Sequence, residues 1–217
     1  MNSKSLLIEK DILDLFSSCN AVWIHDGYTN KPHAELHSGL CSNGYFNCPE
    51  VLKYPQFCEK LAQELVWKLS VNGIRNVDWV IGSSYAAITL SYEVAKKLNA
   101  IHAFTEKDPS GIKKMVWRRM TIPAEATVLQ VEELITTSET FKEVRRAIEE
   151  GNSEPVNFLP IIGTIVHRPH KRTDYTDYKI ITLIEKEIWT AEPDKCPLCK
   201  AGSPRYRPKS HWKELLG

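Results

Sequence analysis

The chain has 217 residues, 42% of them hydrophobic, and a formal net charge of +1. This length suffices for one domain with a full core, and the near-neutral charge gives no general attraction for nucleic acid, so any anion site must be built locally. The sequence shows neither an apolar run of about 18 residues nor a signal-peptide core, so we expect a cytoplasmic protein with no membrane partner.

The N-terminal part of the chain is predicted to form a helix and then a hairpin. Ile8, Ile12 and Leu15 recur at helical spacing, which predicts an amphipathic helix over residues 5–18. Residues 33–47 place turn-forming residues among alternating side chains, which predicts a hairpin or a bent loop.

Two residue pairs in this predicted hairpin suit a flat ligand. Ser38-Gly39 would offer backbone amides, and Tyr45-Phe46 would offer a planar surface on which a heterocycle can stack. Aromatic pairs also pack commonly in hydrophobic cores. The sequence leaves both interpretations open.

The middle of the chain contains two strand–turn–helix units. A helix that begins at Tyr54-Pro55 precedes the first unit, which is a buried strand at residues 78–82 followed by a helix over residues 87–98. The turn between them consists of Ser83, Ser84 and Tyr85. The segment from residue 101 to 120 then predicts a short strand, a polar loop and a return strand.

The second unit carries the most informative residues. The strand at residues 128–131 is predicted to break at Glu132 and Glu133, and apolar spacing resumes in a helix from Phe141. Ligands of open α/β sheets bind beyond the carboxyl ends of strands, and a helix N-terminus attracts phosphate. We therefore expect an anion at the hydroxyl-rich turn between them, which contains Thr136, Thr137, Ser138 and Thr140.

Glu139 complicates this expectation. A carboxylate about 4 Å from a bound phosphate would oppose binding by roughly 4 kcal/mol at an effective dielectric constant near 20. Thr136 and Glu139 also have the spacing of a capping box, in which the turn starts a helix and binds no ligand. The capped turn is the alternative to the phosphate site.

The second unit resembles the phosphoribosyl-pyrophosphate (PRPP) motif of type I phosphoribosyltransferases. The resemblance implies that Glu132 and Glu133 bind the ribose hydroxyls and that the turn binds the 5′-phosphate. The family usually has aspartate at the position of Glu133 and small residues at those of Ser138 and Glu139.

The predicted hairpin resembles, more narrowly, the N-terminal signature of orotate phosphoribosyltransferases. The shared order is a leucine, Ser-Gly, a serine, a Tyr/Phe pair and an asparagine, here residues 36–47. It implies a nucleobase site, with orotate as the expected base. Its residues would be Ser38, Gly39, Tyr45, Phe46 and, after the apolar run of residues 156–166, Arg168. His37, Ala86 and His167 stand where members often carry other residues.

The polar loop at residues 106–114 resembles the family's mobile loop, which closes over the active site, often that of a partner subunit. The resemblance implies a homodimer and a catalytic lysine, with Lys107 the nearest match and Lys113 the second choice. The resemblance also implies that cations of this region bind pyrophosphate together with Ser83, Ser84 and Tyr85. These cations include Lys113, Arg118 and Arg119.

Cys196 and Cys199 are the two cysteines of the six whose spacing suggests chemistry. The C-x-x-C pattern suits half of a zinc site, a redox pair or a structural loop, and His211 is the nearest additional ligand along the chain. A strand at residues 179–184 precedes this tail, which resembles the C-terminal ending of one branch of the same family.

We thus expect an α/β fold with a mainly parallel, Rossmann-like central sheet flanked by helices. The single domain, residues 1–217, would have a core at about 55–185 and a small hood formed by about 20–50 and 186–217. The expected reaction transfers phosphoribose from PRPP to orotate, with Mg²⁺ held weakly by Glu132 and Glu133 and mostly by substrate. The alternatives are another base, or a PRPP-binding regulator without activity.

Overall fold

The predicted parallel sheet forms the centre of the molecule. The computed structural model describes residues 7–111, 115–136, 139–169 and 178–216. Six strands are hydrogen-bonded in the order β10-β9-β8-β5-β6-β7, and all are parallel to their neighbours except the short β7. The bounds are β5 Trp79–Ser83, β6 Ile101–Lys107, β7 Met115–Val116, β8 Thr127–Ile135, β9 Asn157–His167 and β10 Lys179–Glu185.

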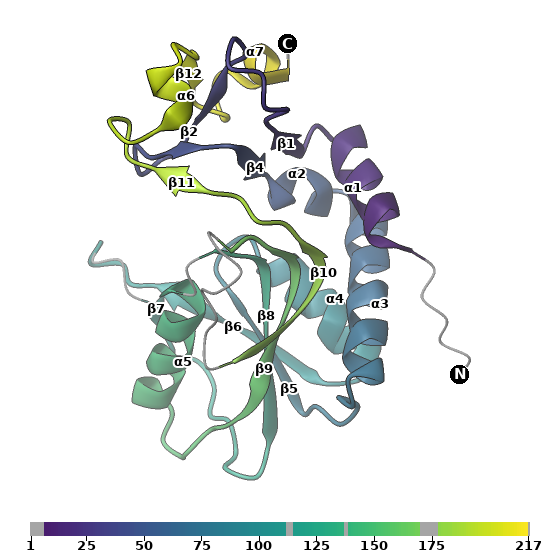
Figure 1. Ribbon diagram of the computed structural model, residues 1–217. Helices are drawn as coiled ribbons and strands as arrows, with labels where there is room; N and C mark the ends of the chain where they lie inside the picture. The colour runs from purple at the N-terminus through teal and green to yellow at the C-terminus, as the bar shows by residue number, and fades with distance from the viewer. Residues whose placement is uncertain (1–6, 112–114, 137–138, 170–177, 217) are drawn as a thin grey trace.

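Helices cover both faces of this sheet (Figure 1). Helices α3 (Pro55–Val71) and α4 (Ile88–Leu98) pack against each other on one face, and α5 (Glu139–Gly151) lies on the other. Leu61, Leu65 and Leu69 of α3 are fully buried, as their helical spacing predicts. All three helices lie where the sequence predicted them. The N-terminal helix α1 (Glu9–Ser18) is also confirmed, with Ile12 and Phe16 buried.

The segments near the two ends of the chain combine into the expected hood (Figure 1). One small sheet pairs β1 (Val22–Ile24) with β4 (Gly44–Phe46), and a second has the order β11-β3-β2-β12. Its strands are β2 His33–Glu35, β3 Cys41–Ser42, β11 Thr190–Ala191 and β12 Arg205–Tyr206. The hood also contains the short helices α2 Cys48–Leu52, α6 Pro197–Lys200 and α7 Trp212–Leu216.

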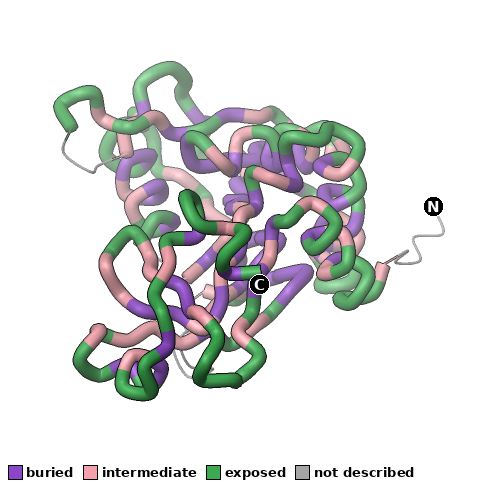
Figure 2. The backbone as a smooth tube through the Cα atoms, turned by 90° about the horizontal axis from the view of Figure 1, so that it is seen from above, coloured by how far each residue is buried: buried purple, intermediate pink, exposed green. Residues whose placement is uncertain are grey.

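The hood lies against the carboxyl edge of the central sheet. Arg168, which directly follows β9, donates from Nη1 to the Gly44 carbonyl of β4 at 3.3 Å. Cys48 of α2 donates from Sγ to the Glu133 carbonyl of β8 at 3.5 Å. Figure 2 shows buried backbone in the interior and exposed turns around it. The hood therefore lies next to the strand ends, where ligands of such sheets bind.

Two predicted strands differ from those observed. The second unit's strand does not break at the acids, because β8 continues through Glu132 and Glu133 to Ile135. Pairing of Glu132 with Thr164 and of Leu134 with Val166 in β9 supplies backbone hydrogen bonds that outweigh the low strand propensity of glutamate. The return strand expected to end near residue 120 is confined to Met115–Val116.

Among the residues that the structure describes, no helix is both long and apolar enough to span a bilayer.

Candidate active site

The central sheet has a topological switch point between β5 and β8. The chain leaves β5 through α4 on one face to reach β6, and it leaves β8 through α5 on the opposite face to reach β9. Connections that diverge in this way open a crevice beyond the carboxyl ends of the two central strands, and ligands of such sheets bind there. Ser83 ends β5 and Glu132 lies near the end of β8, so both line this crevice.

Glu132 joins the two strands across the switch point. The Ser83 hydroxyl donates to its Oε2 at 2.5 Å, and the Gln130 amide donates to its Oε1 at 2.9 Å. The side chain is only 2% exposed. Burial and the neighbouring charge of Glu133 raise the pKa of Glu132 to about 8. The two hydrogen bonds favour ionisation and so have the opposite, smaller effect on this pKa. Glu132 is therefore mostly protonated at neutral pH.

Gln130 and Arg145 form a supporting layer that the sequence analysis did not assign. Arg145 of α5 donates from Nε to Gln130 Oε1 at 3.2 Å and from Nη2 to the Leu159 carbonyl at 2.9 Å. The guanidinium also lies over the rings of Phe158 and Tyr178, at 4.7 and 4.2 Å from their centroids. This layer fixes the Gln130 amide so that its nitrogen faces Glu132. The polar Gln130 inside an apolar strand was the available signal.

Glu133 faces away from Glu132, because adjacent side chains of a strand point to opposite faces of the sheet. It is half-buried, and burial raises its pKa. Its charge in turn helps raise the pKa of the buried Cys48 thiol, which places Glu133 on the side of the hood. The two acids therefore approach the crevice from different directions rather than as one adjacent pair.

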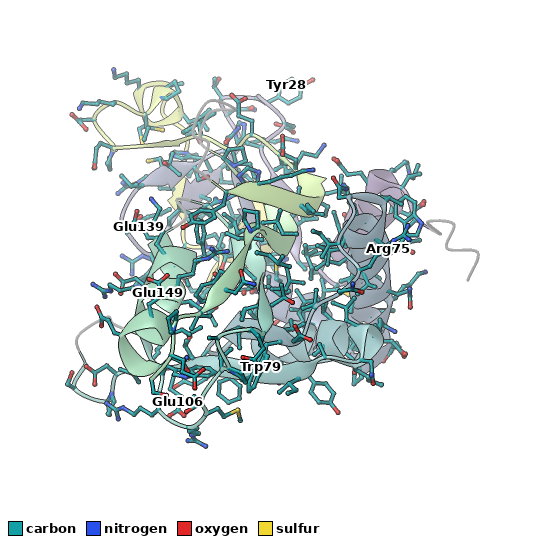
Figure 3. All side chains as sticks on the ribbon, turned by 90° about the horizontal axis from the view of Figure 1, so that it is seen from below. Tyr28, Arg75, Trp79, Glu106, Glu139 and Glu149 are labelled. Atoms are coloured by element: carbon teal, nitrogen blue, oxygen red, sulfur yellow. The ribbon has the colours of Figure 1, made fainter. Side chains whose placement is uncertain are left out.

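A small pocket lies at the start of α5, where the phosphate was expected. Its lining includes Glu132, Thr136, Glu139 and Thr140. Glu139 is the first residue of α5 and exposed, and Figure 3 labels it at the opposite end of the helix from Glu149. The structure describes α5 from Glu139 onward, so the capping box of Thr136 and Glu139 stays a prediction. The expectations for Thr137 and Ser138 lie outside the described residues.

The turn after β5 lies next to the end of β6. Lys107 Nζ stands 5.4 Å from the centroid of the Tyr85 ring, which is 73% exposed, and the Ser84 hydroxyl lies 4.0 Å from Met115 Sδ. Lys107 thus lies beside the turn of Ser83, Ser84 and Tyr85, and the binding of pyrophosphate by these residues stays a prediction.

Gly82 allows this turn to form. A Cβ atom at this position would lie 2.9 Å from Ser91 Cβ and 3.1 Å from the Ala87 carbonyl oxygen. The end of β5 therefore approaches the start of α4 more closely than any other residue type permits.

The arginines predicted to bind pyrophosphate are engaged with acids of their own segment. Arg119 forms an ion pair with Glu106, and Arg118 Nη2 lies 3.9 Å from Asp108. Both arginine side chains are more than half exposed, so these pairs are weak and can exchange. The expectation for Lys113 lies outside the described residues.

The predicted base site is only partly assembled. Tyr45 is half-buried beside Arg168: burial raises the Tyr45 pKa, while the guanidinium opposes that shift. Burial lowers the Arg168 pKa, and its Nε has no hydrogen-bond partner among the described residues. Ser38 and Gly39 lie in the β2–β3 hairpin turn, where Gly39 N donates to the Leu36 carbonyl at 2.9 Å.

Phe46 does not fit the expected stacking role. It is 4% exposed and packs edge-on against Phe16 of α1, with ring centroids 5.7 Å apart. Because Tyr45 and Phe46 are adjacent in β4, only one of them can face the crevice. Phe46 occupies the core side, and its interpretation as a base-binding residue is corrected accordingly.

The curated relatives decide the family. The chain is 32% identical over 201 residues to the orotate phosphoribosyltransferase of Desulforamulus reducens, which covers 93% of this chain and 96% of the relative. It is 36% identical over 181 residues to that of Caldicellulosiruptor bescii, covering 83% and 90%. The chain belongs to the orotate phosphoribosyltransferase family. No protein-family model matches it.

Solved structures of orotate phosphoribosyltransferases and related proteins share the fold. The protein from Aeropyrum pernix aligns with a TM-score of 0.58 at 12% identity, covering 80% of this chain and 93% of that one. The UMP synthase of Leishmania donovani aligns with a TM-score of 0.60 at 16% identity, covering 81% of this chain and 36% of that one. At these identities the likeness concerns the architecture alone.

Magnesium is the metal expected for an orotate phosphoribosyltransferase. Two carboxyl groups, Glu132 and Glu133, lie at the switch point, and Mg²⁺ prefers such oxygen ligands. Glu132 is mostly protonated at neutral pH and both of its oxygens already accept hydrogen bonds, which leaves Glu133 as the better ligand. These residues fit an ion that takes most of its oxygens from substrate and water.

Cys196 and Cys199 lie beside other residues than the sequence predicted. His211 is not beside them: its ring stacks on Tyr206 with centroids 5.5 Å apart. Instead His33 and Cys41, both from the N-terminal part of the hood, lie against Cys196 and Cys199. The sequence analysis missed these two because about 160 residues separate them from the C-x-x-C pair.

Proposed function

We propose that this protein transfers the phosphoribosyl group of PRPP to orotate, which yields orotidine 5′-monophosphate and pyrophosphate in pyrimidine biosynthesis. The observation that carries the proposal is the meeting of Ser83 and Glu132 at the β5–β8 switch point, in a chain related over nearly its whole length to proteins named for this reaction. The sites expected for the pyrophosphate and for the ribose of PRPP both border this contact.

The 5′-phosphate would bind at the start of α5. Thr136 and Thr140 line the pocket there, and the helix N-terminus adds unpaired N–H groups and a positive dipole end. Thr137 and Ser138 complete the proposed loop. Glu139 is exposed, so its carboxylate can turn to solvent when the phosphate enters.

The ribose would bind between Glu132 and Glu133. Glycosyl transfer develops positive charge on the sugar while pyrophosphate leaves, so carboxyl groups near the sugar hydroxyls stabilise the transition state. The raised pKa of Glu132 lets its carboxyl group donate a hydrogen bond to a hydroxyl oxygen, and it becomes a stronger acceptor as cationic charge grows nearby.

Pyrophosphate would bind at the turn of Ser83, Ser84 and Tyr85. Lys107 stands over this turn and is the cation best placed to offset the growing charge of the leaving group. Lys113, Arg118 and Arg119 would add charge once the two arginines exchange their exposed acidic partners for pyrophosphate. Mg²⁺, bound mainly by substrate oxygens, would neutralise charge on the same leaving group.

Orotate would bind between Tyr45 and Arg168, with Ser38 offering its backbone amide. Gly39 would contribute by forming the turn, since its own N–H already donates to the Leu36 carbonyl. Orotate carries a carboxylate, and Arg168 presents a half-buried guanidinium whose Nε has no hydrogen-bond partner among the described residues, a donor set suited to an anion. We further propose that the enzyme works in the cytoplasm as a homodimer, in which the loop after β6 closes over the partner's site.

A pyrophosphate-release assay tests the proposal. The purified protein receives PRPP, Mg²⁺ and one base at a time from orotate, uracil, adenine and hypoxanthine. We expect release of pyrophosphate with orotate only. Turnover with a different base would replace the proposed substrate while keeping the chemistry. PRPP binding without turnover would favour a regulator, the alternative that Glu139 in the phosphate pocket supports.

A further inference from the structure

Three thiols and one imidazole meet inside the hood, away from the proposed active site. The Sγ atoms of Cys41, Cys196 and Cys199 and a ring nitrogen of His33 all lie within 4.8 Å of one another. His33 and Cys41 are on β2 and β3, while Cys196 and Cys199 flank the first turn of α6. His33, Cys41 and Cys196 are buried, and all three cysteines are free thiols.

The spacing within this cluster matches a tetrahedral metal site. Bond lengths of about 2.3 Å for Zn–S and about 2.05 Å for Zn–N place sulfurs about 3.8 Å apart and sulfur about 3.6 Å from nitrogen. Cys41 Sγ lies 3.5 Å from Cys199 Sγ, and His33 Nε2 lies 3.6 Å from Cys196 Sγ and 3.4 Å from Cys199 Sγ. A disulfide would require about 2.05 Å.

The hydrogen bonds around His33 leave the correct nitrogen available. Ser203 donates its hydroxyl proton to the Lys31 carbonyl at 2.5 Å, so its oxygen must accept from His33 Nδ1, 2.7 Å away. A proton on Nδ1 leaves a lone pair on Nε2, which faces the sulfurs. Metal-bound histidines are typically oriented by such a bond from the other nitrogen.

The C-x-x-C segment has the local form of a metal knuckle. Cys196 is the N-cap of α6, and the Cys199 N–H donates to Cys196 Sγ at 3.4 Å. A backbone donor at sulfur stabilises thiolate, the form that binds metal. Arg205 of β12 interacts electrostatically with Cys41 and also pairs with Glu35 at 3.5 Å, so its positive charge offsets part of the excess negative charge of three thiolates around one divalent ion.

We propose that His33, Cys41, Cys196 and Cys199 bind one Zn²⁺ ion that holds the hood together. Four nitrogen and sulfur ligands fill a tetrahedral shell and leave no position for substrate, as in structural rather than catalytic zinc sites. The ion would tie the C-terminal segment to both strands of the β2–β3 hairpin, whose turn contains Ser38 and Gly39. It would thereby fix the base side of the proposed active site.

Metal analysis of the purified, tag-free protein tests the proposal. Prepared without chelator, the protein is expected to contain one zinc per chain by mass spectrometry. His33→Gln and Cys196→Ser should each abolish stoichiometric zinc. The matched controls are His211→Gln and Cys19→Ser, which change the same residue types outside the cluster and should keep the full zinc content.

Cobalt provides a readout that needs no variant to fold. Wild-type protein expressed with Co²⁺ should show the visible absorption of tetrahedral cobalt with a thiolate-to-cobalt charge-transfer band. Zinc removal should also raise KM for orotate more than KM for PRPP, an expectation that rests on the proposed function. Metal content is measured without any substrate, so an inactive protein that holds zinc would overturn the proposed function alone.

Three results would overturn the zinc proposal. The first is wild-type protein that contains no zinc and gives no tetrahedral cobalt spectrum. The second is zinc loss in the His211→Gln or Cys19→Ser control, which would place the metal elsewhere. The third is mass-spectrometric detection of a disulfide among Cys41, Cys196 and Cys199 in protein purified under nitrogen, which would make the cluster a redox group.

Discussion

At the scale of single residues, Glu132 links stability to pH. Its folded-state pKa of about 8 lies above the ordinary glutamate value of 4.5, so the folded protein holds this proton more tightly than the unfolded chain does. The stabilising effect is complete below the unfolded pKa and is lost as pH rises through the folded pKa. Deprotonation of Glu132 in the folded protein would reduce the free energy of unfolding by an amount on the order of 4 kcal/mol.

Glu132→Gln should remove this pH dependence. The amide keeps the shape and the partners Ser83 and Gln130 but does not titrate. We expect wild type and variant to have similar stability at pH 5 and the variant to be the more stable at pH 9, as measured by urea unfolding. Parallel stability curves between these pH values would mean that the Glu132 pKa is not raised.

Glu139→Gln should strengthen PRPP binding. The Glu139 carboxylate lines the proposed phosphate pocket and is exposed, so solvent screens most of its repulsion toward the phosphate. A remaining repulsion of about 1.4 kcal/mol corresponds to about a tenfold decrease in KM for PRPP when the charge is removed. Glu149→Gln, an exposed change at the other end of α5, is the matched control. An increased KM would instead make Glu139 a ligand for the substrate.

At the scale of elements, the contact between β5 and α4 sets the position of the pyrophosphate turn. Gly82→Ala would push the turn away from Ser91 and Ala87, with a loss of stability of about 1–3 kcal/mol and a clear fall in kcat. Thermal unfolding and initial rates measure both effects. Gly163→Ala in β9 is the control, since its Cβ would meet the side chains of Leu65 and Val131 at ordinary contact distances of 3.4 Å or more. Equal losses in the two variants would refute a specific role for Gly82.

The sequence predicted the elements well where the signal is local. Apolar spacing and turn residues lie within one strand–turn–helix unit, so α3, α4 and α5 were found from short windows. The course of β8 was not predicted in full, because its continuation through Glu132 depends on pairing with Thr164 of β9, which lies far along the chain. Pairing between distant strands has no signature in either strand alone.

The same limit explains the uneven result for the site. Ser83 and Glu132 were predicted from motifs and do meet at the switch point, while Lys107 lies beside Tyr85 in the turn after β5. The layer of Gln130 and Arg145 was missed because it arises only when α5 packs on the sheet. Phe46 was misassigned because the two faces of β4 could not be distinguished before the position of Phe16 was known.

At the scale of the whole molecule, Arg168 bridges the sheet and the hood. Arg168→Lys would keep the charge but lose the fork-shaped donor set that reaches Gly44 and the proposed base. We expect KM for orotate to rise about tenfold or more while KM for PRPP changes little, since about 1.4 kcal/mol or more is lost per charged hydrogen bond. Steady-state kinetics with each substrate varied in turn measures the difference.

Arg75→Lys is the matched control for this variant. Arg75 is exposed and precedes β5 at the amino edge of the sheet, so its replacement should leave both KM values unchanged. Equal increases in KM for orotate and for PRPP in the Arg168 variant would indicate that the hood has shifted as a whole, and would refute specific recognition of the base.

The pairing of β2 with β12 has a consequence for biosynthesis. The His33 N–H donates to the Pro204 carbonyl, and strands β2 and β12 run parallel, so β2 completes its pairing only after Arg205 and Tyr206 have left the ribosome. The central sheet can fold while translation continues, since domains and their parts form in order of emergence. A nascent chain that stops before β12 would thus carry a complete central sheet beside an incomplete hood.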